Sequence, residues 1–246
     1  MFDTYAEIFA QRASEYHFAM QQWPLARVAE FQSVVEPLAD VADGLVCDMP
    51  SGGGYLADHL QPGLDYLAVD PASGFFVEWE KPRRRLSAEI TSVPLDDGAV
   101  DHIVSLAGLH HEPSLPAVFA EMRRLLRRGG RLVIEDAAVD TPPARFLNGF
   151  VAANNPMGHD GRFLDERTAG LLEAAGFVLL SEAEVPIPWA FDDLDSAGDF
   201  GRYLFGVTSL EPRAVADALG EKIGFDLVDG RPHLRWQLHR IVCEAA

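Results

Sequence analysis

Residues 46–57 read Val-Cys-Asp-Met-Pro-Ser-Gly-Gly-Gly-Tyr-Leu-Ala. Val46 and Cys47 end an apolar, strand-like run, and Asp48 places a carboxylate where that strand would emerge. Gly52 to Gly54 form a turn without side chains, so a ligand can approach the backbone closely, and apolar residues at helical spacing come next. A strand, an acidic residue, a glycine turn and a helix in this order predict a site for a nucleotide-type ligand at the carboxyl end of a parallel strand.

Strand-like and helical segments extend this unit along the chain. Apolar runs before residue 137 alternate with helical patterns, which predicts parallel βαβ units with right-handed crossovers. The last strand-like segment alternates apolar and polar residues, so we expect it to run antiparallel to its neighbour. The expected fold class is therefore α/β, a Rossmann-like, doubly wound sheet of seven strands that is mostly parallel with an antiparallel last strand. The predicted strands are 45–47, 66–69, 86–90, 103–106, 132–136, 177–185 and 234–242, and helices are predicted twice within 2–40, from Ser114 to Gly129-Gly130, over 165–175 and, as an insertion near the C-terminus, twice within 192–224.

Length, charge and cysteine content narrow the classes of function. A chain of 246 residues suits one α/β domain. The net charge of −18 argues against nucleic acid as a partner, because a phosphate backbone calls for a basic surface. The sequence has neither an apolar run long enough to span a membrane nor the basic start of a signal peptide. Cys47 and Cys243 lie in apolar runs and are expected to be reduced, so we expect a cytoplasmic protein without a membrane partner.

A second carboxylate follows the glycine turn at a sequence spacing that is typical of nucleotide-binding folds. Asp70 ends the second apolar strand and lies 18 residues after Gly52. An acidic residue about 20 residues after such a turn reaches ribose hydroxyls in dinucleotide folds. The alternative is that Asp70 only caps a loop before Pro71, and the preceding glycine turn favours ribose binding.

Four segments in this order form a known pattern. The first is the acidic residue and glycine turn of Asp48 to Gly54, and the second is Asp70. The third joins Glu89 to Asp101 through Val-Pro-Leu-Asp-Asp-Gly, and the fourth is the Gly129-Gly130 turn before the fifth strand. With these segments the chain resembles class I S-adenosylmethionine-dependent methyltransferases, in particular the small-molecule, methyltransferase type 11-like branch. Pro50 departs from the pattern, because the family usually has its first glycine there and proline removes a backbone donor.

The resemblance implies S-adenosylmethionine as the cofactor. Asp48 would face the methionine ammonium group, Asp70 would accept from both ribose hydroxyls, and Glu89 would accept from the adenine amino group. The backbone amide of Ile90 would serve a ring nitrogen, and Ser105 to Ala107 would lie near the sulfonium. The implied cofactor-binding residues are Asp48, Pro50, Ser51, Gly52, Gly54, Asp70, Pro71, Glu89, Ile90, Ser105, Leu106 and Ala107.

The chain is expected to form one domain. Residues 1–246 would be a single methyltransferase domain, with a cofactor-binding core over 45–136. Residues 1–40 would be an N-terminal helical lid, and 141–165 and 192–224 would be cap segments on the substrate side, although ordinary packing on the sheet also explains Tyr16, His17 and Phe18. Aromatic residues in these segments favour a small, partly apolar molecule as the methyl acceptor, although they could equally belong to the core.

Two histidines follow the fourth strand, near the expected position of the methyl group. His110 or His111 could take a proton from an acceptor hydroxyl, although one or both could simply shape the pocket. His159 with Asp160 is expected to stabilise its loop. A metal bound by these residues is conceivable by residue type, but adjacent histidines rarely point the same way, so no metal ligand is predicted.

Two other functions compete with methyl transfer. Gly52-Gly53-Gly54-Tyr55-Leu56-Ala57 satisfies the G-x-G-x-x-G/A pattern, so an NAD(P)-dependent oxidoreductase is one alternative. Asp48, the segment from Glu89 to Asp101 and the antiparallel last strand disfavour it. The other alternative is a protein that binds S-adenosylmethionine but catalyses a reaction without methyl transfer, because fold and function separate easily.

Overall fold

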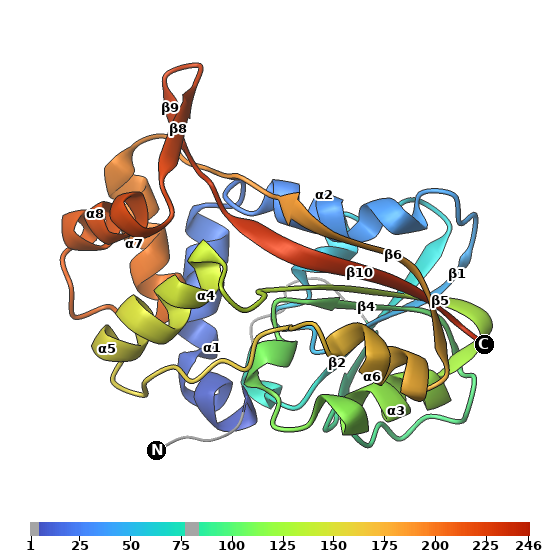
Figure 1. Ribbon diagram of the computed structural model, residues 1–246. Coiled ribbons are helices and arrows are strands. Elements are labelled where there is room, and N and C mark those ends of the chain that lie inside the picture. The colour runs from blue at the N-terminus through green and yellow to red at the C-terminus, as the bar shows by residue number, and fades with distance from the viewer. Residues whose placement is uncertain (1–4, 77–83) are drawn as a thin grey trace.

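A seven-stranded sheet forms the centre of the computed structural model, which describes residues 5–76 and 84–246. The strand order is β3-β2-β1-β4-β5-β10-β6 (Figure 1). Strands β1 to β5 pair in parallel, and β10 is antiparallel to both β5 and β6. This confirms the predicted Rossmann-like fold with an antiparallel last strand. The strands are β1 Gly44–Asp48, β2 Leu64–Asp70, β3 Arg84–Ser87, β4 Val100–Leu106, β5 Leu126–Asp136, β6 Phe177–Pro186 and β10 Gln237–Ala245.

The central strands are buried on both faces, which explains their continuous apolar sequences. Val46, Val104 and Val133 point to one face and belong to the same hydrophobic cluster as α2 (Val28–Val35) and α7 (Leu194–Phe205). Their chain neighbours point to the other face, where α3 (Leu115–Leu125) and α6 (Thr168–Ala174) cover the sheet. Both cysteines are buried on this second face without a disulfide bond, as predicted. None of the helices among the described residues is long and apolar enough to cross a membrane.

Helices occupy the segments before and after the central strands that were predicted to be helical. The N-terminal pair is α1 (Tyr5–Gln22) and α2, and the C-terminal pair is α7 and α8 (Pro212–Lys222). Between β5 and β6, a helical stretch runs through α4 (Pro142–Phe146), the wider turn Leu147–Val151 and α5 (Ala152–Asn154). Figure 1 shows α1, α4, α5, α7 and α8 gathered beside one end of the sheet.

A second, three-stranded sheet was not predicted. It has the order β7-β9-β8 and is built from β7 (Trp189–Ala190), β8 (Phe225–Val228) and β9 (Arg231–Leu234). Strands β8 and β9 form the hairpin that projects from the molecule in Figure 1, and its turn is Asp229-Gly230, both with positive φ. Leu234 pairs with Trp189 in this sheet, so the predicted strand 234–242 is divided and the last strand of the main sheet begins at Gln237.

Three boundaries differ from the predictions. A single 3₁₀ turn, Tyr55–Asp58, replaces the helix expected after the glycine turn, and its Leu56 packs in the same cluster as Phe31 and Val34 of α2. The helix expected to stop at Gly129-Gly130 ends at Leu125, and the two glycines lie in the irregular start of β5. Strand β3 ends at Ser87, so Glu89 and Ile90 follow the strand rather than belonging to it. Arg84 and Arg85 are exposed at the start of β3.

Candidate active site

The carboxyl ends of β1, β2, β4 and β5 meet at one edge of the sheet, where two cavities open. We call the first the glycine-turn cavity; it measures about 510 Å³, including space that is open to solvent. Its floor comes from the segments that follow β1 and β4, and α1 contributes the opposite wall. The lining residues include Asp48, Pro50, Ser51, Gly52, Tyr55, Leu106, Ala107 and Gly108 from the sheet side and Tyr5, Phe9 and Tyr16 from α1.

Two buried carboxylates lie beneath the glycine turn. Asp48 accepts a hydrogen bond from the Tyr66 hydroxyl at 2.7 Å. Asp70 accepts from the backbone amide of Gly52 at 2.7 Å, the amide of Ala72 at 2.8 Å and the Tyr5 hydroxyl at 3.0 Å. Burial raises the pKa of Asp70 to about 7, although these hydrogen bonds oppose the rise. Asp70 therefore ties the glycine turn to its own loop and to the start of α1.

The glycine turn needs its glycines for both conformation and space. Gly52 and Gly54 have φ values of 53° and 67°, which favour glycine. A Cβ on Gly53 would lie 2.3 Å from the Tyr55 ring. The Ser51 hydroxyl is buried and has no hydrogen-bond partner among the described residues. A buried, unpartnered hydroxyl beside a turn without side chains suits a polar ligand.

Pro50 fits this turn because no donor is required at its position. The amides on either side of it, at Met49 and Ser51, donate to the carbonyls of Val104 and Val69 at 3.0 Å. The peptide bond before Pro50 is cis, and the proline ring packs against Gly108, where a Cβ would lie 2.4 Å from Pro50 Cγ. Proline thus replaces the family's first glycine without leaving a backbone group unpaired.

The residues that line this cavity do not include the predicted cofactor-binding residues Ser105, Pro71, Glu89 and Ile90. Ser105 is buried in β4, and its hydroxyl also has no partner among the described residues. Pro71 is half-buried after Asp70, Ile90 is buried and Glu89 is exposed. The amide of Ala88 donates to the carbonyl of Asp70 at 3.2 Å, so the segment that carries Glu89 and Ile90 lies on the Asp70 side of the glycine turn.

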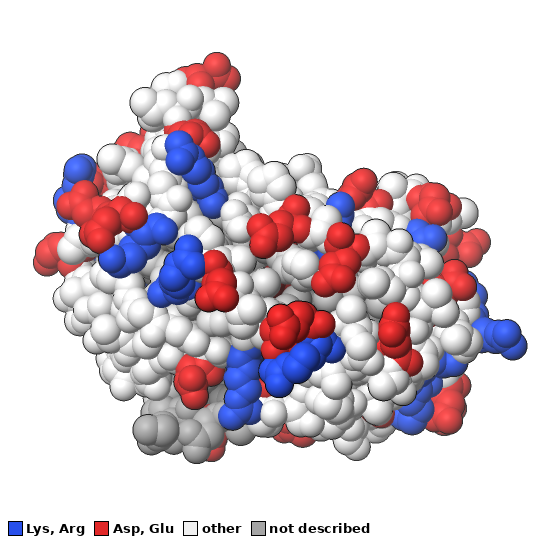
Figure 2. Space-filling view, viewed as in Figure 1, with Lys and Arg blue, Asp and Glu red and all other residues white. Residues whose placement is uncertain are grey.

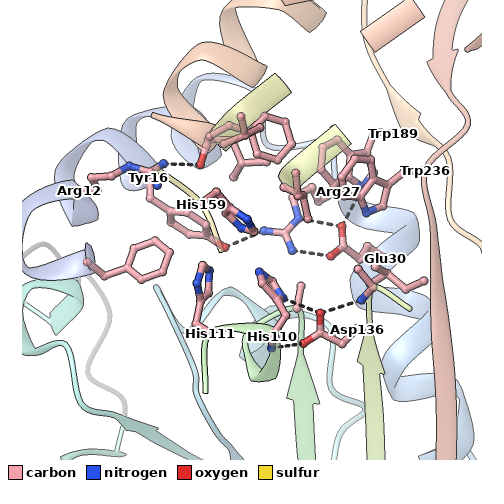
Figure 3. A pocket seen from close by; sticks show the side chains of 18 residues that line it. Arg12, Tyr16, Arg27, Glu30, His110, His111, Asp136, His159, Trp189 and Trp236 are labelled. Carbon is pink, nitrogen blue, oxygen red and sulfur yellow. Dashed lines mark hydrogen bonds and ion pairs between the residues drawn. The ribbon is translucent and has the colours of Figure 1, made fainter. Parts of the chain in front are cut away.

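The second cavity, which we call the histidine cavity, encloses about 630 Å³. Figure 3 shows its polar side chains converging from separate elements. Its walls are mostly apolar and aromatic, as in many small-molecule sites. The lining includes Phe9, Arg12 and Tyr16 of α1, Arg27 and Glu30, Ala107, the residues His110, His111 and His159, Asp136, Leu147, Val151, Leu204, Phe205, Trp189 and Trp236.

His110 is held by a carboxylate that was not predicted as a site residue. Its Nδ1 lies 2.6 Å from Oδ1 of Asp136, and its backbone amide donates to Oδ2 of Asp136 at 3.2 Å. Both side chains are buried. Because a carboxylate accepts, Nδ1 carries the proton and Nε2 offers its lone pair. Asp136 ends β5 as Asp48 and Asp70 end their strands, a signal that the sequence offered.

His111 and His159 lie against His110 in the same cavity. The ring of His110 is 4.2 Å from that of His111 and 5.5 Å from that of His159, and the last two are 5.2 Å apart. The adjacent histidines therefore reach one cavity, contrary to the expectation that they diverge. Burial lowers the pKa of His159 to about 3 and that of His111 well below its usual value. Asp160 is exposed beside them.

A buried ion pair forms a wall shared by α1, α2 and β7. Arg27 donates from Nε to Glu30 at 2.8 Å and from Nη1 to the Tyr16 hydroxyl at 2.7 Å. The indole of Trp189 also donates to Glu30 at 2.8 Å. Sequence reasoning missed this pair, because charged residues in a helical pattern are usually exposed.

The two cavities are neighbours and share four lining residues, which are Phe9, Tyr16, Arg27 and Ala107. Ala107 follows β4, has φ 49° and donates its amide to the carbonyl of Glu135 at 2.8 Å. A non-glycine residue with positive φ is uncommon and marks a locally constrained backbone. Ala107, with its small methyl side chain, lies in the wall that the glycine-turn cavity and the histidine cavity share.

Comparison with known proteins places the centre of the chain in a family. Residues 47–134 match the model of the methyltransferase domain. A demethylmenaquinone methyltransferase of Beutenbergia cavernae is 33% identical over 102 residues, which cover 40% of this chain and 42% of that protein. A tRNA U34 carboxymethyltransferase of Actinobacillus succinogenes is 26% identical over 121 residues, which cover 45% and 38%. The chain thus spans about two fifths of the length of these curated relatives.

A solved structure extends the similarity of the fold over the whole chain. The 1,6-didemethyltoxoflavin-N1-methyltransferase of Burkholderia thailandensis, bound to S-adenosylhomocysteine, has a TM-score of 0.54 and 17% identity and covers 100% of this chain and 92% of its own. The family match and the fold confirm the resemblance to class I S-adenosylmethionine-dependent methyltransferases. They also support S-adenosylmethionine, rather than a nicotinamide, as the cofactor.

Proposed function

We propose that this chain, which carries a class I methyltransferase domain, transfers a methyl group from S-adenosylmethionine to a small, partly apolar molecule. One observation carries the proposal: a cavity floored by the glycine turn lies next to a second cavity lined by histidines and aromatic residues, and the two share Ala107 in their lining. Methyl transfer needs two ligands held end to end, and proximity and orientation supply much of such a rate enhancement.

The polar groups of the glycine-turn cavity suit the cofactor. In the proposal, Asp48 faces the methionine ammonium group and Asp70 accepts from the ribose hydroxyls, and the Ser51 hydroxyl gains a partner. Glu89 and Ile90 contact the adenine, because their segment lies beside Asp70. A Cβ on Gly53 would collide with the ring of Tyr55. Ser105, Leu106 and Ala107 complete the end that faces the histidine cavity.

The cofactor supplies an electrophilic methyl group on a sulfonium, and the chain's own residues align the acceptor and remove its proton. Nε2 of His110 is the proposed proton acceptor, because Asp136 holds Nδ1–H and thereby sets the tautomer. His111 shapes the cavity beside it. The walls built by Trp189, Trp236 and Phe205 exclude water from the acceptor.

The proposed acceptor is a small molecule rather than RNA. The histidine cavity is lined mainly by apolar and aromatic side chains, and the chain carries a net charge of −18. On the face seen in Figure 2, basic side chains lie among acidic ones without a broad basic patch. A surface of this kind gives little attraction for a phosphate backbone.

The segments outside the cofactor core are proposed to enclose the acceptor. Helix α1 contributes Phe9 and Tyr16 to both cavities, as expected of a lid within 1–40. Leu147 and Val151, within 141–165, and Leu204, within 192–224, line the histidine cavity from the other side. We therefore propose the single-domain arrangement with a lid and two cap segments.

The test is methyl transfer from labelled S-adenosylmethionine to a panel of small phenols, amines and carboxylic acids, with transfer RNA as a separate arm. Label transfer to a small acceptor with release of S-adenosylhomocysteine is expected. Transfer only to RNA would refute the small-molecule acceptor, and cofactor binding without S-adenosylhomocysteine release would favour a reaction other than methyl transfer.

Asp136→Asn tests the proposed proton acceptor on the best small acceptor found. Turnover should fall by about 10²–10⁴, the usual contribution of general base catalysis, while affinity for S-adenosylhomocysteine stays unchanged. His233→Ala, which removes a histidine from the distant β9, serves as the matched control. Unchanged turnover in Asp136→Asn would show that the proton acceptor does not depend on Asp136.

A further inference from the structure

Three imidazole rings converge in the histidine cavity. His110 and His111 lie on the short turn Leu109–His111 after β4, and His159 lies in the loop after α5. One ring nitrogen from each of the three can be chosen so that all lie within 4.8 Å of one another. Figure 3 shows His159 facing His110 and His111. All three residues line the cavity, so the point between them is open to a ligand there.

Two of the rings have one nitrogen held by a hydrogen bond. Asp136 holds Nδ1 of His110. Oδ1 of Asn148 lies 2.8 Å from Nδ1 of His159. Gly161 fixes which way the Asn148 amide faces, because its amide donates to Oδ1 and its carbonyl accepts from Nδ2, both at 2.8 Å. Asn148 therefore accepts from His159, and Nε2 of His110 and of His159 each keep a lone pair.

This arrangement is that of histidines that bind a metal ion. Such histidines usually donate their other ring N–H to a carboxylate or an oxygen of the protein, which sets the tautomer. His111 completes the set, and its ring centroid lies 5.9 Å from those of Tyr5 and Phe9.

We propose that His110, His111 and His159 bind one divalent transition-metal ion of the zinc type, with its open coordination positions toward the histidine cavity. Imidazole ligands suit Zn²⁺, Fe²⁺, Co²⁺ and Ni²⁺ and disfavour Mg²⁺. Zinc–nitrogen bonds of about 2.0–2.1 Å require the three nitrogens to draw together by roughly 1–1.5 Å from the widest spacing. Three protein ligands and an open position are typical of catalytic rather than structural zinc.

The ion would also change how the acceptor loses its proton, a consequence that rests on the proposed function. With the ion bound, Nε2 of His110 is a ligand and no longer a base. An acceptor hydroxyl that binds the ion through its oxygen has a lowered pKa. It therefore releases its proton to water and presents an oxygen nucleophile beside Ala107. The metal site itself requires neither the cofactor nor the acceptor.

The test is equilibrium dialysis of the full chain against Zn²⁺ and Co²⁺, with the visible d–d spectrum of bound Co²⁺ as a second readout. The wild type should hold one ion per chain and none of Mg²⁺. His159→Ala and His111→Ala should each weaken binding by about 100-fold or more, and Asn148→Ala by about 10-fold. His233→Ala, the matched control, should bind as the wild type does.

Affinity for S-adenosylhomocysteine, measured on the same variants, checks that each has folded. The proposal is overturned if the wild type binds no Zn²⁺ or Co²⁺ more tightly than folded His159→Ala, or if His233→Ala removes the binding as well. Retained binding with an unchanged Co²⁺ spectrum in His159→Ala also overturns it. Metal binding is measured without an acceptor, so a failure of methyl transfer would not affect this result. A failure of metal binding would likewise leave the proposed methyl transfer untouched.

Discussion

Replacing Tyr5 by Phe tests how a ribose reaches Asp70. A carboxylate offers about four lone-pair positions. In the structure the amides of Gly52 and Ala72 and the Tyr5 hydroxyl occupy three of them. One position remains for two ribose hydroxyls. If both hydroxyls donate to Asp70, the Tyr5 hydroxyl has to leave, and every cofactor molecule that binds must displace it.

The size of this effect follows from the kind of bond. A hydrogen bond to a charged group contributes a net stabilisation of about 1.5–3 kcal/mol. Tyr5→Phe should therefore lower the free energy of unfolding of the ligand-free protein by about that amount. The variant no longer has a bond to displace, so its affinity for S-adenosylhomocysteine should rise by about 10- to 100-fold, the same free energy expressed as a binding ratio.

Isothermal titration calorimetry with S-adenosylhomocysteine and urea denaturation measure the two quantities on one sample. Asp70→Asn is the companion variant, and it should weaken binding whether residue 5 is Tyr or Phe. The reasoning fails if Tyr5→Phe loses stability as expected but binds S-adenosylhomocysteine no more tightly than the wild type. It also fails if Asp70→Asn binds normally, because the ribose would then not depend on this carboxylate.

Further predictions concern pH, a close packing contact and the buried ion pair. Burial raises the folded-state pKa of Asp70 to about 7, above the value of about 3.9 expected when unfolded, so the folded chain binds the extra proton between these values. The contribution of Asp70 to the free energy of unfolding of the ligand-free protein should fall as pH rises across that window. Urea denaturation against pH checks this, and an Asp70→Asn profile of the same slope would contradict it. Gly108→Ala places a Cβ 2.4 Å from Pro50 Cγ and should cost about 1–3 kcal/mol by overpacking; unchanged thermal and urea midpoints would argue that the turn can shift. Glu30→Ala leaves the charge of Arg27 buried without its partner and should lower stability by about 3–5 kcal/mol in urea denaturation. The Arg27→Met/Glu30→Leu double variant should lose much less, and equal losses would show that packing rather than charge is responsible.

The strands of the main sheet could be predicted because short stretches of sequence indicate each of them. Short apolar runs that end in an acidic residue recur through the first half of the chain, and Asp48 and Asp70 lie at strand ends as expected. The alternation in the last strand correctly indicated its antiparallel direction. The two-residue strand Trp189–Ala190 has no such pattern, so the small sheet that it forms with the β8–β9 hairpin could not be predicted from periodicity.

The residue types of the site could be predicted from the sequence, but the hydrogen bonds between its side chains could not. Asp136 meets His110 only because β5 lies next to β4 and the turn Leu109–His111 folds back over its end. The helix expected after the glycine turn is a single 3₁₀ turn, and its Leu56 belongs to the same hydrophobic cluster as Phe31 and Val34 of α2. Both outcomes depend on tertiary contacts between segments far apart in the chain, and tertiary contacts override local propensity.

Helix α1 contributes Phe9 and Tyr16 to the wall of both cavities, and this sharing bears on the kinetics of the protein. If α1 is the lid proposed above, two ligands behind it exchange with solvent through the same displacement, and their residence times are coupled. We expect a substitution that loosens α1 to speed the departure of both products together and to leave the intrinsic rate of the chemical step unchanged. In steady state the opening of α1 would then limit the turnover rate, and the two products would leave together rather than by independent routes.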